Sequence, residues 1–151
     1  MRLAGQAQDS GACGACLASV APTSTTWGPI VCDSPTACEN NAGGCVDLVL
    51  GTVADEEGQG GGGSCGDLVA AEQACDDYAC GACFANDTEA AKCIASADAD
   101  ECASYADAES STTGACAAIQ GDAAPPAIAA CFPQSDADAV AFVDVFCGTG
   151  P

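Results

Sequence analysis

The chain has 151 residues and a formal net charge of −20, with no histidine and only two basic residues, Arg2 and Lys92. Phosphate backbones and anionic membrane surfaces are bound by clustered Lys and Arg, so we expect neither as a partner. Ca²⁺ or a cationic partner remains compatible with this charge. Ile, Leu, Val and Phe together make up only about 15% of the chain, and a highly charged chain below ~20% is expected to be disordered unless something besides apolar burial stabilises it.

Cysteine supplies that stabilisation. The 14 cysteines are an even number, as expected of a scaffold in which seven disulfides use every thiol. Disulfides persist in oxidising compartments, which predicts a secreted protein. No signal peptide is visible, since Met1 to Gly5 is followed by polar residues and not by an apolar stretch. The cysteines expected to form disulfides are Cys13, Cys16, Cys32, Cys38, Cys45, Cys65, Cys75, Cys80, Cys83, Cys93, Cys102, Cys116, Cys131 and Cys147.

The first half of the chain is expected to contain strands or extended segments followed by one helix. Valine and threonine recur over residues 25–31 and 45–53, which favours extended chain. Residues 58–64 are rich in glycine and predict a flexible loop. The spacing of Leu68, Ala71 and Cys75 predicts a short helix over 66–78.

The second half is expected to be helical. Ala90, Cys93, Ile94 and Ala97 fall on one helical face, with Asp87 or Thr88 as the cap. Residues 127–132 predict one or two helical turns, and a further helix opens near residue 135, with Val140, Val143 and Phe146 directed inward. The predicted fold class is small and disulfide-rich, built mainly of short α-helices with irregular loops and little β-structure.

An internal repeat divides the chain. Residues 12–18 recur as 79–85 with six of seven residues identical. The spacing of the later cysteines agrees, so the sequence predicts an N-terminal segment 1–11, a cysteine-rich module 12–79 and a second module 80–151 that closes with Cys147. If Cys80 bonds back into the first module, Cys13 is left with Cys93 or with a neighbouring subunit. The matched cysteines are Cys13, Cys16, Cys32, Cys45 and Cys65 with Cys80, Cys83, Cys102, Cys116 and Cys131, respectively.

The two Cys-Gly-Ala-Cys sequences, at residues 13–16 and 80–83, have the spacing of a thiol–disulfide oxidoreductase motif. That chemistry needs a thiolate stabilised at the N-terminus of a helix. Acidic surroundings instead raise the pKa of a thiol, so we expect these cysteines to form structural disulfides. A four-thiolate zinc site is a further alternative, but it needs reduced thiols.

Three acidic residues, Asp98, Asp100 and Glu101, form a candidate Ca²⁺ site. The EF-hand pattern is not met, because Cys102 and Ala103 stand where that loop needs an oxygen ligand and glycine. The adjacent carboxylates Asp76 and Asp77 have the chemistry of a glycosidase pair, although few aromatic side chains are available to bind a sugar.

Asn86-Asp87-Thr88 is an N-glycosylation sequon, so Asn86 is a candidate modification site.

These patterns favour a non-enzymatic extracellular structural or interaction protein without a cofactor. It would be a disulfide-bonded subunit of a surface appendage, filament or larger assembly, with copies of itself or other protein subunits as partners. The alternatives are a Ca²⁺-dependent acidic binding or adhesion module and a Cys-x-x-Cys thiol–disulfide oxidoreductase. The chain contains no stretch apolar enough to span a membrane.

Overall fold

The computed structural model describes residues 18–20, 28–34, 37–52, 63–84, 86–121, 124–135 and 138–147. This part of the chain is mostly helical and contains four disulfides between cysteines that are both described, which confirms the predicted fold class. Its elements are β1 Ala18–Val20, β2 Ile30–Ser34, β3 Ala37–Asn40, α2 Ala42–Leu50, α3 Cys65–Cys80, η1 Gly81–Cys83, α4 Asp87–Ala99, α5 Ala103–Glu109, η2 Ala115–Ile119, η4 Pro126–Cys131 and α6 Asp138–Cys147.

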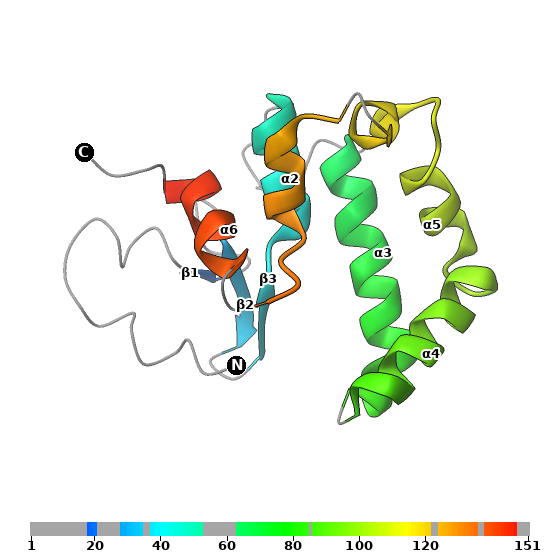
Figure 1. Cartoon of the computed structure of the whole chain (residues 1–151). Helices are drawn as coiled ribbons and strands as arrows, with labels where there is room; N and C mark the ends of the chain where they lie inside the picture. Colours follow the sequence, from blue (N-terminus) through cyan, green and yellow to red (C-terminus); the bar gives the residue numbers. More distant parts are fainter. Residues whose placement is uncertain are drawn as a thin grey trace.

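The longest helix, α3, lies between two groups of elements (Figure 1). On one side α2 packs against α3, η4 and α6, next to a small sheet in which β2 pairs in parallel with β1 and antiparallel with β3. On the other side α4 and α5 pack against α3. The helix α3 therefore contributes residues to both hydrophobic clusters described below.

The prediction of extended chain over residues 45–53 is wrong, because residues 42–50 form helix α2. The Asn41 side chain caps its first turn by accepting the N–H of Gly44 at 2.9 Å. Gly51 ends it in the left-handed conformation, with φ 67°. Val46 is completely buried in this helix, so packing outweighs the strand preference of valine.

Two glycines allow α2 and α3 to approach closely. A β-carbon built on Gly66 would overlap the backbone oxygen of Gly43, and one built on Gly43 would overlap the backbone oxygen of Gly66. The contact brings Asp47 of α2 against the start of α3, where its buried carboxylate accepts the N–H of Gly66 at 3.0 Å and the hydroxyl of Ser64 at 2.9 Å.

The larger hydrophobic cluster lies around α2 and contains two disulfides, Cys45–Cys131 and Cys65–Cys116. Phe142 of α6 is buried there and makes an edge-to-face contact with Phe146. Val140, which was predicted to face inward, is exposed, because α6 turns Phe142 toward the cluster instead. The fully or almost fully buried members are Cys45, Val46, Cys65, Val69, Cys116, Ile128, Cys131 and Phe142.

The smaller cluster joins α3 to α4 and α5 through the disulfides Cys75–Cys102 and Cys80–Cys93. Helix α4 occupies the predicted range, but its cap is Asn86 and not Asp87 or Thr88. The side-chain oxygen Oδ1 of Asn86 accepts the N–H groups of both Thr88 and Glu89.

Most of the described disulfides join the two predicted modules. Cys45–Cys131, Cys65–Cys116 and Cys75–Cys102 each connect a residue before position 80 to one after it. The predicted alignment matches Cys45 with Cys116 and Cys65 with Cys131. Cys45–Cys131 and Cys65–Cys116 are therefore equivalent bonds when one module is superposed on the other. The suggested Cys13–Cys93 bond is wrong, because Cys93 is bonded to Cys80. The module boundaries themselves stay a prediction.

Candidate functional site

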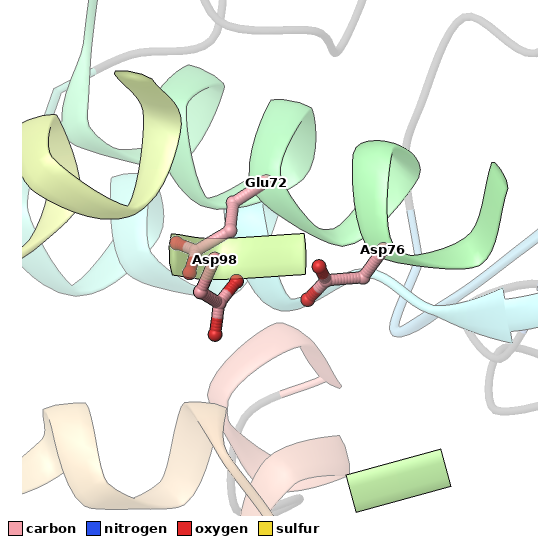
Figure 2. A group of neighbouring side chains, drawn as sticks. All are labelled: Glu72, Asp76 and Asp98. Carbon is pink, nitrogen blue, oxygen red and sulfur yellow. The ribbon is translucent and has the colours of Figure 1, made fainter. Parts of the chain in front are cut away.

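Three carboxylates from two helices meet on one side of α3. Glu72 and Asp76 are four residues apart on α3, so both lie on the same helical face, and Asp98 approaches them from the last turn of α4 (Figure 2). The Cys75–Cys102 disulfide joins the residue before Asp76 to a residue four positions after Asp98, and it holds α3 against the junction of α4 and α5. We call Glu72, Asp76 and Asp98 the acidic cluster.

The carboxylates of the acidic cluster point toward one another (Figure 2), and one oxygen from each lies within 4.8 Å of the others. One oxygen of each side chain is buried and has no hydrogen-bond partner: Oε2 of Glu72, Oδ1 of Asp76 and Oδ1 of Asp98. Buried polar atoms in proteins are nearly always hydrogen-bonded, so three unpartnered acceptors in one place indicate a group that accepts a proton or a cation.

The surroundings raise the pKa of two of these carboxyls. Burial raises the pKa of Glu72 to about 8, assisted by a hydrogen bond with Glu109 and by repulsion from Glu109, Asp98 and Asp76. Burial also raises the pKa of Asp76 to about 6, assisted by repulsion from Asp98, by a side-chain hydrogen bond with Asp98 and by repulsion from Asp77 and Glu109. Without a cation, Glu72 therefore holds a proton at neutral pH.

No basic side chain neutralises the cluster within the described ranges. Lys92 is the basic residue found there, and it pairs with Glu89 at 3.3 Å on the exposed surface of α4. Among the described residues, the negative charge of the cluster therefore has no basic counterpart.

The structure places the three residues of the predicted Ca²⁺ site apart. Asp98 belongs to the acidic cluster, whereas Asp100 and Glu101 are exposed in the turn after α4 and are not grouped with it. Glu72 and Asp76 were not predicted as ligands. Their four-residue spacing within the predicted helix 66–78 was the available signal, but their pairing with Asp98 depends on how α4 folds back onto α3.

The two cysteines of the described Cys-x-x-Cys motif, Cys80 and Cys83, are not bonded to each other. Cys80 is completely buried and bonded to Cys93, and Cys83 is unpaired and half-buried. This differs from the expectation that all 14 cysteines are bonded. Cys147 is disulfide-bonded. Cys13 and Cys16 lie outside the described residues, as do the side chains of Cys32 and Cys38.

Asn86 is exposed in the turn that connects η1 to α4, as a glycan acceptor must be.

Comparison with known protein families, curated proteins and solved structures finds no match to this chain. Among the described helices, none is long and apolar enough to cross a membrane.

Proposed function

We propose that this protein is a non-enzymatic extracellular interaction module, stapled by disulfides, in which Ca²⁺ bound by the acidic cluster locks α3 to α4. The observation that carries the proposal is the meeting of the carboxylates of Glu72, Asp76 and Asp98, each of which also has one buried oxygen without a hydrogen-bond partner. The extracellular location is supported by the disulfides, which persist where thiols are oxidised.

Ca²⁺ fits the chemistry and the size of the cluster. It prefers oxygen ligands at about 2.3–2.6 Å, so two oxygens on opposite sides of the ion are about 5 Å apart. The ligand oxygens of the cluster lie within 4.8 Å of one another. Three carboxylates can donate up to about six oxygens when each binds through both, and water can complete the shell. The partial exposure of the three residues leaves access for that water.

The remaining features support a binding role over catalysis. The chain has no histidine, the usual general base near neutral pH. The disulfide Cys80–Cys93 removes Cys80 from the exchange chemistry that a Cys-x-x-Cys oxidoreductase performs between its own two cysteines. A cation at the α3–α4 contact would set the relative position of two helices, which is how Ca²⁺ controls interaction surfaces in other proteins.

Calorimetric titration and thermal unfolding of the full oxidised chain test the proposal. A ligand that binds only the folded state at 100 times its Kd stabilises it by about 2.7 kcal/mol, so Ca²⁺ should raise the melting temperature. Asp98→Asn and Asp76→Asn should abolish the heat of binding and the temperature shift. The matched control is Asp100→Asn, which removes one negative charge nearby but outside the cluster. If Asp98→Asn and Asp100→Asn reduce the heat of binding and the temperature shift equally, Ca²⁺ is attracted to the acidic surface in general and not bound by the cluster.

A second candidate, a subunit of a covalently joined assembly, is favoured by Cys83. A cysteine without a partner in a disulfide-rich protein is suited to bond with another molecule. Cys83 is accessible in part and is followed by the exposed Phe84. Electrophoresis of the native protein without reductant should then show species larger than one chain that disappear in Cys83→Ser. A purely monomeric native protein would exclude this candidate and leave the Ca²⁺ proposal unaffected.

A further inference from the structure

The short turn between η1 and α4 exposes Phe84 and, two residues later in the chain, Asn86. The N–H of Asn86 donates to the carbonyl oxygen of Cys83 at 3.1 Å, which closes the turn. Phe84 lies within it and leaves 44% of its surface exposed. Asn86 and Thr88, the first and third residues of the sequon Asn86-Asp87-Thr88, are exposed as well. Exposed apolar area is unfavourable in water, so a group that covered the exposed part of the Phe84 ring would stabilise the turn.

The Asn86 side chain uses one of its two polar atoms to cap α4. Its carbonyl oxygen Oδ1 accepts the N–H of Thr88 at 3.0 Å and that of Glu89 at 3.2 Å. The amide nitrogen Nδ2 takes no part in these bonds. An N-linked sugar is attached to Nδ2 and leaves Oδ1 a carbonyl oxygen. Glycosylation is therefore compatible with the cap, and the cap fixes the direction in which Nδ2 leaves the helix.

We propose that Asn86 carries an N-linked glycan and that the ring of Phe84 packs against its first sugar. The donor is an oligosaccharide linked to a lipid pyrophosphate. The amide nitrogen attacks the anomeric carbon, the new C–N bond replaces the C–O bond to the pyrophosphate, the nitrogen loses one proton, and the lipid pyrophosphate leaves. This proposal rests on the extracellular location proposed above and is independent of Ca²⁺ binding.

The position of Phe84 near the sequon gives the glycan a stabilising role in the proposed contact. A pyranose ring has one face of C–H groups, which packs on an aromatic face as other apolar groups do. Phe84 and Asn86 are two residues apart in a hydrogen-bonded turn, so a sugar on Asn86 starts close enough along the chain to reach the ring. Covering the ring stabilises the folded turn relative to the unfolded chain, in which the sugar and the ring are not held together.

Glycopeptide mapping of the full chain, secreted by a eukaryotic host behind a supplied signal sequence, tests the attachment. The peptide that contains Asn86 should carry a mass increase that N-glycan-releasing amidase removes. Thr88→Ala should abolish it, while keeping the Asn86 cap, which uses only the backbone N–H of Thr88. An unmodified Asn86 in the secreted and folded protein would overturn the proposal.

Melting temperatures with and without Thr88→Ala, in three backgrounds, test the sugar–ring contact. The glycosylated protein should melt at a higher temperature than Thr88→Ala. This difference should disappear when Phe84→Ala is present in both proteins, and it should persist with Tyr105→Ala, which removes a ring of similar exposure, 39%, on α5. If glycosylation raises the melting temperature equally with and without Phe84, the proposed contact between the sugar and the ring is wrong. All samples are measured with a chelator, so the outcome is separate from the test of the acidic cluster.

Discussion

The carboxylate of Asp47 in α2 accepts the backbone N–H of Gly66 in the first turn of α3 at 3.0 Å. The first N–H groups of a helix have no partner within the helix, and the same end of the helix favours negative charge. The hydroxyls of Ser64 and Thr52 also donate to this carboxylate, at 2.9 and 2.7 Å. The buried carboxylate of Asp47 is therefore stabilised by three hydrogen bonds, one from a backbone N–H and two from hydroxyls.

Asp47→Ala should lower the free energy of unfolding by about 3 kcal/mol, because it leaves the buried N–H of Gly66 and the half-buried hydroxyl of Ser64 without this acceptor. Urea unfolding of the oxidised protein measures the loss. Asp77→Ala, an acidic residue exposed on α3, is the control and should change stability by less than about 0.5 kcal/mol. A similar small effect at Asp47 would show that water replaces its contacts.

Gly66→Ala should destabilise the fold by about 1–3 kcal/mol. The added methyl group would overlap the backbone oxygen of Gly43 and the carboxylate of Asp47, so α2 and α3 must separate. Gly81→Ala is the matched control, since a β-carbon there meets nothing within 4 Å and the backbone has ordinary helical angles. It should be neutral or stabilising by up to about 1 kcal/mol. Equal unfolding midpoints for both variants would contradict the close helix contact.

Without a divalent cation, stability should fall as the pH rises from about 4.5 to about 8. The pKa of Glu72 is 4.5 in the unfolded chain and about 8 in the folded one, so the folded state binds the extra proton within this window. The stability that protonated Glu72 adds to the folded state is fully present below pH 4.5. It is lost as the pH rises past the pKa of about 8 in the folded chain. Asp76 acts in the same direction between its values of 3.8 and about 6.

Urea midpoints in chelator, below pH 4.5 and at pH 8, measure this contribution against Glu72→Gln, which mimics the protonated side chain. The wild-type protein should lose more stability than the variant between these two conditions. Ca²⁺ competes with the proton, so its binding should tighten over the same pH range. Parallel pH profiles for the two proteins would show that Glu72 titrates as an ordinary surface carboxyl.

A thiol reagent applied to the folded, unreduced and monomeric protein should label Cys83 and leave the four described disulfides intact. Cys83 is half-buried and unpaired, whereas Cys80, Cys45 and Cys65 are bonded and almost completely buried. Peptide mapping locates the label. Because the 14 cysteines are an even number, an unpaired Cys83 prevents seven bridges within one chain. An intact mass that shows seven bridges in a monomer would prove that Cys83 has a partner.

The sequence by itself determined the fold class and most of the helices. Too few large apolar residues and 14 cysteines require a disulfide-bonded fold. The periodic apolar positions predicted helices over 66–78 and around 90–97, which α3 and α4 confirm. These features are local, because helical spacing is set by residues within a few turns.

Only the tertiary structure decided which distant groups meet. The helix α2 replaces a predicted extended segment, because burial of Val46 and the glycine contact with α3 outweigh local preference. Disulfide partners such as Cys45 and Cys131 cannot be deduced from an even count of cysteines, which permits many pairings. The acidic cluster likewise depends on Asp98 being carried back to Glu72 and Asp76 by the fold of α4 on α3. Contacts between residues far apart in the chain are set by packing and crosslinks, which no local pattern records.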